Sequence, residues 1–213
     1  MRPLLALPLL LAPLVLAGCM DTGPRDTAAV QAPAWEAGDM WRWREPDLIV
    51  TGGPFQGGAN ETHDIIWVVN GTTTVAGVPV WEVLETGEKN GAPFGDPDVF
   101  YKAVDTQELV NESGRMPSLL KFPFTVGTSY RTGDGEDEIR VLPREPVSTP
   151  AGNFSAYRLE RWSALPNGTL VMFHVLYYAP EAGNVVRWET HYGGGQFSVR
   201  ELVAFRFQGA SRQ

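Results

Sequence analysis

Apolar and polar residues alternate along most of this chain with the period of β-strands. Residues 41–44 (Trp-Arg-Trp-Arg) alternate strictly, and residues 64–69 (Asp-Ile-Ile-Trp-Val-Val) are rich in β-branched and aromatic side chains. Both patterns are typical of strands with at least one buried face. Similar segments, each predicted to form a strand, occur at residues 78–84, 99–104, 139–142, 156–162, 170–178, 185–189 and 197–207.

Turn-forming residues separate these segments. Asn70-Gly71 is the strongest short hairpin signal, Ala76-Gly77 precedes the next strand, and further clusters occur at residues 133–135, 150–152, 166–168 and 193–195. Many short strands with frequent turns predict an all-β fold. We expect a single antiparallel curved sheet or open barrel of about ten to twelve strands. We expect at most a short turn of helix, near Gln107 or Met116.

The two halves of the chain contain similar short motifs in the same order. Residues 36–42, 75–82 and 100–102 match residues 125–131, 150–160 and 177–179. A duplicated β-meander would produce this order, because each half alone cannot bury its apolar face. Chance similarity is the alternative, since short β motifs favour the same residues.

The N-terminus has the features of a lipoprotein signal peptide, predicted to span residues 1–18. Arg2 provides a positive charge, residues 4–16 are apolar apart from Pro8 and Pro13, and Ala17-Gly18 provides small residues before a cleavage point. The apolar run is shorter than the about 20 residues of a membrane-spanning helix. Leu16-Ala17-Gly18-Cys19 resembles the lipobox of bacterial and some archaeal lipoproteins. The resemblance implies that Cys19 receives a diacylglycerol and becomes the new N-terminus.

Behind the lipidation site we expect a flexible tether, residues 19–34, and one all-β domain, residues 35–210. The tether has little apolar pattern and would span roughly 20 Å as a flexible chain. Removal of residues 1–18, whose one charged side chain is Arg2, takes the net charge from −8 to −9. A negative domain without a Lys/Arg cluster is a poor candidate for binding nucleic acid.

Candidate catalytic and metal-binding residues are sparse. Cys19 is the only cysteine, and the histidines His63, His174 and His191 are far apart in the sequence. No Gly-x-Ser-x-Gly motif occurs, so a serine hydrolase would lack its nucleophile elbow. The acidic residues 134–138 lack EF-hand spacing, and the glycine-rich residues 52–58 lack the motif and helix of a phosphate-binding loop. We therefore predict no enzymatic activity, no cofactor and no metal.

Five of the seven asparagines lie in Asn-x-Ser/Thr sequons, which makes them candidate glycosylation sites: Asn60, Asn70, Asn111, Asn153 and Asn167. Turn chemistry is the alternative explanation, because Asn-Gly followed by Thr is a natural hairpin sequence. If the sequons are glycosylated, they favour an archaeal surface over a bacterial periplasm.

Aromatic residues in the predicted strands are the remaining candidates for a functional site. They either fill the core between sheet faces or line a cleft that binds an apolar ligand or glycan. The candidate lining residues are Trp41, Trp43, Trp67, Trp81, Phe100, Phe122, Tyr177 and Trp188.

Three motifs carry a resemblance that covers residues 35 to about 207. Residues 122–130 (FPFTVGTSY), 147–157 (VSTPAGNFSAY) and 177–187 (YYAPEAGNVVR) resemble a broad group of uncharacterised prokaryotic β-rich lipoproteins. The motifs are structural: Pro150-Ala151-Gly152 is a turn into a strand, and residues 179–183 form a tight connection in which Gly183 is expected to take a positive φ. The architecture also resembles periplasmic lipoprotein carriers, which hold acyl chains in a half-open barrel.

We expect a protein that is anchored to the cell membrane or outer membrane through Cys19 and that faces away from the cytoplasm. Its expected role is to bind a hydrophobic ligand or lipid. The alternative is a structural or protein-interaction module on the cell surface, with an envelope protein as partner and no ligand cavity. A hydrolytic enzyme would need His174 or His191 beside a carboxylate in a pocket.

Lipidation makes a direct prediction for Cys19→Ser. The wild-type protein expressed with its signal peptide should incorporate a radioactive fatty acid, and the variant should not, because the thiolate is the acylated nucleophile. Autoradiography of the purified proteins measures the label. An unlabelled wild-type protein, or a variant that keeps the label, would contradict the assignment.

Overall fold

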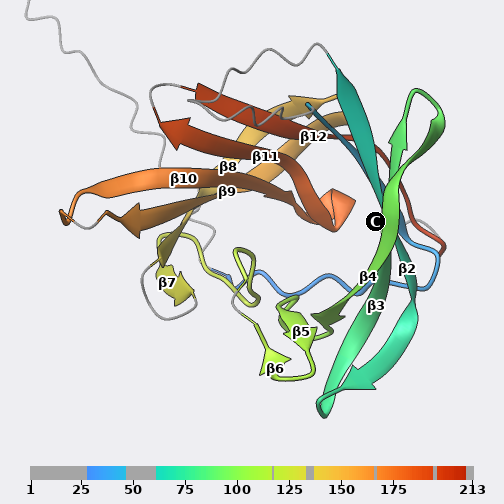
Figure 1. Ribbon diagram of the computed structural model, residues 1–213. Helices are drawn as coiled ribbons and strands as arrows, with labels where there is room; N and C mark the ends of the chain where they lie inside the picture. Colours follow the sequence, from blue (N-terminus) through green and yellow to red (C-terminus); the bar gives the residue numbers. More distant parts are fainter. Residues whose placement is uncertain are drawn as a thin grey trace, which may run out of the picture.

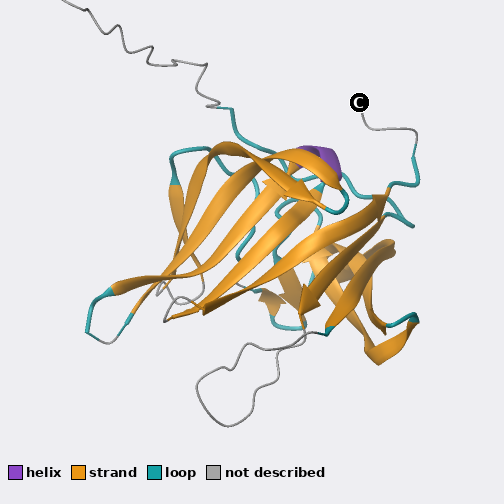
Figure 2. Ribbon diagram, turned by 90° about the horizontal axis from the view of Figure 1, so that it is seen from above, coloured by secondary structure: helices purple, strands orange, loops and turns teal. Residues whose placement is uncertain are grey.

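The chain forms one antiparallel sheet of twelve strands that curls into a half-barrel (Figures 1 and 2). The computed structural model describes residues 28–46, 61–116, 118–132, 137–165, 167–193 and 196–209. The prediction of a single all-β curved sheet is confirmed. The strands are β1 (Met40–Pro46), β2 (Thr62–Val75), β3 (Val78–Lys89), β4 (Ala92–Ala103), β5 (Leu109–Asn111), β6 (Gly114–Arg115), β7 (Ser129–Thr132), β8 (Asp137–Thr149), β9 (Gly152–Ala164), β10 (Leu170–Ala179), β11 (Asn184–Gly193) and β12 (Gln196–Arg206).

Strands that follow one another in the sequence mostly lie side by side in the sheet. The order is β6-β5-β4-β3-β2-β1-β12-β11-β10-β9-β8-β7. The first and last strands pair at its centre, where Met40 lies opposite Arg206 and Trp41 opposite Phe205. The sheet is therefore two antiparallel meanders, β1–β6 and β7–β12, joined along β1 and β12.

The segments predicted as strands are confirmed, but the hairpin predicted at Asn70-Gly71 is wrong. Strand β2 continues through both residues, and the register with β3 shifts between Val69 and Gly71, which marks a β-bulge. The chain turns instead at Ala76-Gly77, where both residues have a positive φ. The pairing of β2 with β3 before and after Asn70 outweighs the preference of Asn70-Gly71 for a turn.

Helix is confined to one 3₁₀ turn in the described part of the chain, η1 (Pro180–Ala182). The helical turn expected near Gln107 or Met116 is absent there; Gln107 lies in an irregular turn with a φ of 58°. Gly183 ends η1 with a φ of 60°, and its N–H donates to the Pro180 carbonyl at 3.0 Å, as the sequence motif predicts. No described helix is long and apolar enough to span a membrane.

The last part of the expected tether packs on the sheet. Val30 forms a β-bridge with Phe124, with N–H···O distances of 2.8 and 3.2 Å, and Val30 and Ala32 contact the core. The folded body therefore begins before residue 35, because two small apolar side chains gain burial there. The signal peptide, Cys19, the glycine-rich residues 52–58 and Asn60 lie outside the described residues.

Two large hydrophobic clusters and a small one, formed by Val80, Ala103 and Val110, support the sheet. The larger of the first two surrounds Trp41 and Trp43 and includes side chains from β2, β3 and β8–β12. In the smaller one, Phe122 and Phe124 pack on Tyr157 and Tyr178, with ring centroids 5.1 to 5.8 Å apart. The segment between β6 and β7 thereby covers the inner face of β8–β10.

A tryptophan clamp (Trp35, Trp41 and Trp43) fixes η1 inside the half-barrel. The indole N–H groups donate to three nearby backbone carbonyls: Trp35 to Gly183 at 3.0 Å, Trp41 to Ala182 at 2.7 Å and Trp43 to Val185 at 2.8 Å. All three indoles are almost fully buried. In Figure 1, η1 accordingly lies between the wall of β2–β4 and the wall of β10–β12.

The matching motifs of the two halves fall on corresponding strands. The first set lies at or before β1, β3 and β4, and the second at or before β7, β9 and β10. Ala76-Gly77 forms the turn before β3, and Pro150-Ala151 forms the turn before β9. The duplication itself stays a prediction.

An ion cluster on the other side of β1–β3 holds the central strands together. Asp64 is 5% exposed and accepts hydrogen bonds from Arg42 at 2.6 Å and Arg44 at 2.9 Å, and Arg42 also pairs with Glu88 at 2.9 Å. Burial alone would raise the pKa of Asp64, but the bonds from Arg44 and Arg42 outweigh it and hold the pKa below the ordinary 3.8.

The clamp predicts a large effect for Trp41→Phe. The variant keeps an aromatic ring but leaves the buried Ala182 carbonyl without its donor, so the free energy of unfolding should fall by about 2–3 kcal/mol. Urea denaturation measures the change. The matched control is Trp162→Phe, because the Trp162 indole N–H binds a carboxylate of its own strand in a partly exposed position. Equal losses in the two variants would contradict the clamp.

The ion cluster predicts a pH-dependent effect for Asp64→Asn. At pH 7 the variant should be less stable by about 1–2 kcal/mol, a discounted value because the side chains of Arg42 and Arg44 are 32% and 51% exposed. The folded pKa is lowered, so this stability is present above the unfolded pKa and is lost as the pH falls through the folded value.

Unfolding curves at pH 7 and pH 2.5 should therefore show a difference that shrinks in acid. Glu138→Gln, which removes a partly exposed ion pair with Arg140, serves as the control and should lose less stability at pH 7 than Asp64→Asn. A pH-independent loss in Asp64→Asn would show that packing, and not charge, is responsible.

Candidate functional site: a hydrophobic pocket in the half-barrel

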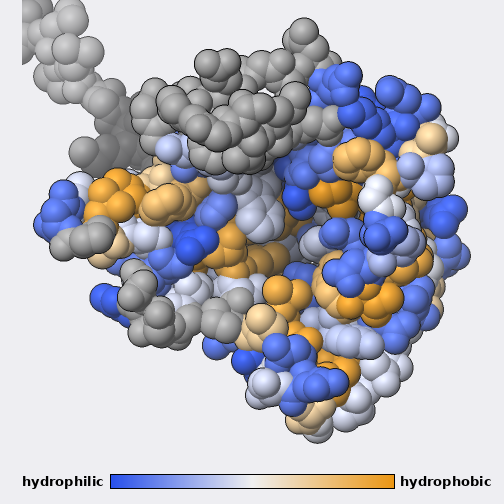
Figure 3. Space-filling model, viewed as in Figure 1, coloured by the Kyte–Doolittle hydropathy of each residue, from blue (hydrophilic) through white to orange (hydrophobic). Residues whose placement is uncertain are grey.

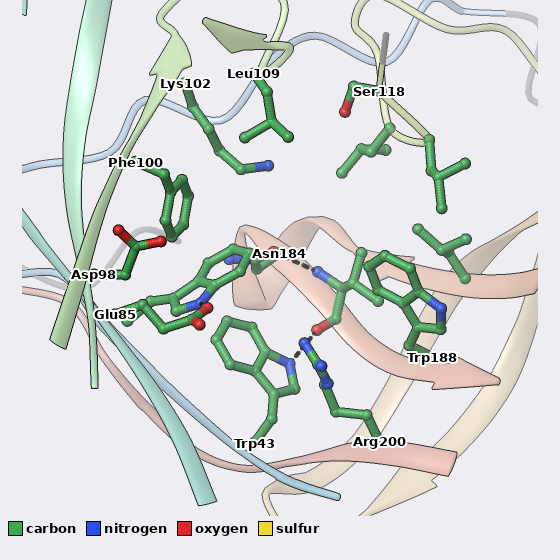
Figure 4. A pocket seen from close by; sticks show the side chains of 15 residues that line it. Trp43, Glu85, Asp98, Phe100, Lys102, Leu109, Ser118, Asn184, Trp188 and Arg200 are labelled. Atoms are coloured by element: carbon green, nitrogen blue, oxygen red, sulfur yellow. Dashed lines mark hydrogen bonds between the residues drawn. The ribbon is translucent and has the colours of Figure 1, made fainter. Parts of the chain in front are cut away.

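A pocket with a cavity volume of about 430 Å³ opens in the hollow of the half-barrel (Figure 3). It lies between β1–β4 on one side and β10–β12 on the other, and the segment after β6 contributes to its wall. The lining residues are Trp43, Trp67, Glu85, Asp98, Phe100, Lys102, Leu109, Ser118, Leu119, Leu120, Leu176, Asn184, Val185, Trp188 and Arg200 (Figure 4). Volume and lining are those of a small-molecule site.

Aromatic rings form one wall of the pocket. Trp43 of β1, Trp67 of β2 and Phe100 of β4 stack edge to face, with centroid distances of 4.7 Å and 4.8 Å. The clamp bond from Trp43 to Val185 fixes one end of this row. The wall is therefore rigid before any ligand arrives, which lowers the entropic cost of binding.

Trp188 of β11 stands on the opposite side (Figure 4). Its indole N–H donates to Nδ1 of His174 at 3.1 Å. Burial lowers the pKa of His174 to about 4, so this imidazole is neutral at physiological pH and can accept the bond. Aliphatic side chains fill the remaining lining: Leu109, Leu119, Leu120, Leu176 and Val185.

Lys102 is a buried cation that points into the pocket (Figure 4). The residue is 8% exposed, and burial lowers its pKa to about 8. Its Nζ lies 5.5 Å from the Trp67 ring centroid and has one long contact, 3.5 Å, to the Gln107 carbonyl. No carboxylate among the described residues lies within 4 Å of it.

Asn184 is a second buried polar residue in the lining. It is 4% exposed, and its Oδ1 accepts a hydrogen bond from the Val185 N–H at 2.8 Å. Its Nδ2 has no hydrogen-bond partner among the described residues. A buried amide N–H₂ without an acceptor is costly, and this nitrogen has almost no solvent-accessible surface.

The other charged groups of the pocket already have partners. Arg200 pairs with Glu45 at 2.5 Å, and Glu85 accepts the Trp67 indole N–H at 2.6 Å. Asp98 is exposed and accepts the Val99 N–H at 2.8 Å. Lys102 and Asn184 thus supply the two buried polar groups of the described lining that lack a close partner.

The structure brings four of the eight candidate lining residues together. Trp43, Trp67, Phe100 and Trp188 line the pocket. The other four pack elsewhere: Trp41 and Tyr177 are buried in the larger cluster, Trp81 packs against it, and Phe122 belongs to the smaller cluster. For these four, filling the core is the role that the structure gives.

Lys102, Asn184 and the leucines of the pocket are not among the site residues predicted from the sequence. The sequence does indicate the position of Lys102. It lies two residues from Phe100 in a predicted strand, so the two side chains lie on the same face of that strand. Asn184 and Leu119 carry no such signal, since turns and irregular chain bring them to the pocket.

The three histidines take part in local contacts. His63 pairs with Glu45 at 3.2 Å, His174 accepts from Trp188, and His191 stacks on Phe197. No group of three or more metal-ligating side chains occurs in the described ranges. Of the acidic residues 134–138, Asp137 pairs with Arg161 and Glu138 with Arg140, and the first three lie outside the described residues.

All four sequon asparagines that the structure describes are exposed: Asn70, Asn111, Asn153 and Asn167. Two of them form Asx turns, since Asn111 Oδ1 accepts the Ser113 N–H at 2.9 Å and Asn167 Oδ1 accepts the Thr169 N–H at 3.0 Å. Turn chemistry therefore accounts for two sequons, and glycosylation stays a prediction.

Comparison with known proteins gives two weak structural similarities. No family model and no curated protein matches the chain. A protein from Bacteroides fragilis, described as exported and with a YmcC-like fold, is 15% identical over 84% of this chain and 100% of its own, with a TM-score of 0.47. A protein from Parabacteroides distasonis, described as a lipoprotein, is 14% identical over 82% and 97%, with a TM-score of 0.45. Similarities this low identify neither a family nor a function.

Proposed function

We propose that this protein is a lipid-anchored envelope protein that binds one hydrophobic ligand or lipid chain in the hollow of its half-barrel. The observation that carries the proposal is the pocket of about 430 Å³ whose walls are mainly aromatic and aliphatic. Its volume lies at the lower end of the range for small-ligand sites, about 300–1,000 Å³, which suits a single chain.

Two further observations support binding over a purely structural role. The tryptophan clamp and the row of Trp43, Trp67 and Phe100 preorganise the pocket instead of letting it collapse. The apolar walls also stay partly exposed, since Trp67, Phe100 and Trp188 are only half-buried. A ligand would remove this surface from water, at about 25 cal/mol per Å² of apolar area.

The lipobox resemblance of residues 16–19 supports the location. Acylation at Cys19 would hold the domain at a membrane surface, where hydrophobic ligands are supplied and consumed. The negative net charge of the chain suits a soluble domain that is held at the surface by its anchor alone.

The proposal predicts that Ser118→Trp blocks binding. Ser118 lines the pocket, so an indole there occupies the cavity. The wild-type protein should bind the fluorescent apolar probe N-phenyl-1-naphthylamine saturably at one site. The variant should bind it at least tenfold more weakly, a loss of about 1.4 kcal/mol. Fluorescence titration measures both affinities.

Ser113→Trp is the matched control, because the same substitution then lies on the exposed tip between β5 and β6. It should leave the affinity unchanged, and circular dichroism should show the same sheet content in all three proteins. Absence of saturable binding to the wild-type protein, or equal affinities in the two variants, would contradict a ligand-binding pocket and favour a surface interaction module.

A further inference from the structure

The pocket contains a positive charge that the protein itself does not neutralise. Lys102 is more than nine-tenths buried, and its Nζ contacts the Gln107 carbonyl only at 3.5 Å. A buried ammonium group without a carboxylate partner is costly, because the interior solvates charge poorly. The Trp67 ring at 5.5 Å compensates part of this cost through a cation–π interaction.

Asn184 adds a hydrogen-bond donor to the same lining. Its Nδ2 is buried and has no acceptor among the described residues, whereas its Oδ1 is occupied by the Val185 N–H. Both buried groups of the lining that lack a close partner are therefore donors. Donors without acceptors select a ligand that carries acceptor oxygens, and the charge on Lys102 favours anionic ones.

We propose that the ligand is a single-chain amphiphile with an anionic head, such as a fatty acid carboxylate, and that Lys102 binds that head. This inference rests on the proposed function, because it specifies the ligand of the same pocket. The aromatic wall holds the chain, and the charge on Lys102 sets which end of the ligand binds beside it.

The sequence of β4 orients the ligand. Lys102, Phe100 and Asp98 alternate on the strand and all line the pocket, so they share one face. Lys102 and Asp98 are four residues apart, about 13 Å along a strand. Asp98 and its cross-strand partner Glu85 thus form an acidic end of the pocket, away from the cation.

The acidic end is a weaker candidate for recognising a head group. Asp98 is exposed to solvent, and Glu85 already accepts the Trp67 indole N–H at 2.6 Å. Both carboxylates already accept hydrogen bonds. A cationic ligand would therefore stabilise them less than an anionic ligand would stabilise Lys102. Their charge also repels an anionic head and directs it toward Lys102.

The test compares three probes of equal chain length: dodecanoate and dodecylamine below their micelle concentrations, and dodecanol below its solubility limit. Isothermal titration of the wild-type protein should show dodecanoate binding at least tenfold tighter than dodecanol, with dodecylamine the weakest. In Lys102→Met the preference for dodecanoate over dodecanol should fall to within twofold. The affinity for dodecanol itself should stay within threefold of wild type, since the apolar wall is intact.

Lys121→Met is the matched control for the change in net charge. Lys121 is half exposed and pairs with Glu108 outside the pocket, so the preference for dodecanoate should be kept. Lys102→Gln serves as a second neutral variant, and circular dichroism checks the fold of each.

The outcomes separate this inference from the proposed function. If neither dodecanoate nor dodecanol binds the wild-type protein, the proposed function fails. Three other results would contradict this inference alone: equal affinities for dodecanoate and dodecanol, tightest binding of dodecylamine, or a Lys102→Met variant that still prefers dodecanoate. In each case the pocket binds apolar chains, but Lys102 does not recognise an anionic head.

Discussion

The tryptophan clamp is the constraint on which the rest of the structure depends. A half-open sheet of twelve strands encloses a hollow that solvent could fill. One turn of 3₁₀ helix occupies part of that hollow. Trp35, Trp41 and Trp43 hold that turn by donating their indole N–H groups to the carbonyls of Gly183, Ala182 and Val185. Because each indole both packs and donates, burial of the turn leaves these carbonyls satisfied. The central strand β1 and the connection between β10 and β11 are thereby tied together across the hollow.

The pocket is a consequence of this arrangement. The clamp places Asn184 and Val185 at one wall, and the remainder of the row, Trp67 and Phe100, continues from Trp43 across neighbouring strands. The same hydrogen bonds that stabilise the fold therefore fix the geometry of the candidate site. Lys102 of β4 then remains buried in the apolar part of the cavity with no described carboxylate within 4 Å, which is an unusual cost for a structure unless a ligand offsets it.

Much of the fold can be predicted from the local sequence pattern, but the pocket cannot. Alternation in residues 41–44 and β-branched runs such as residues 64–69 predict strands, because the period of two is a local property. Asn70-Gly71 is an exception, because β2 pairs with β3 both before and after these residues. This pairing outweighs their turn preference, and a β-bulge forms there in place of a hairpin turn. The pocket depends on which strands meet: Trp43 and Trp188 are far apart in the sequence and face each other only because β1 pairs with β12 and β12 with β11. Trp41 and Trp43 lie on the same strand with the same pattern, yet only Trp43 lines the pocket.

A crystal structure of the protein grown with dodecanoate tests directly whether the hollow holds an anionic amphiphile with its head at Lys102. One carboxylate oxygen should lie within about 3 Å of Lys102 Nζ, as in charge-assisted hydrogen bonds, with the chain lying between Phe100 and Trp188. A pocket without dodecanoate, or a chain that directs its carboxylate toward solvent or toward Asp98, would contradict it.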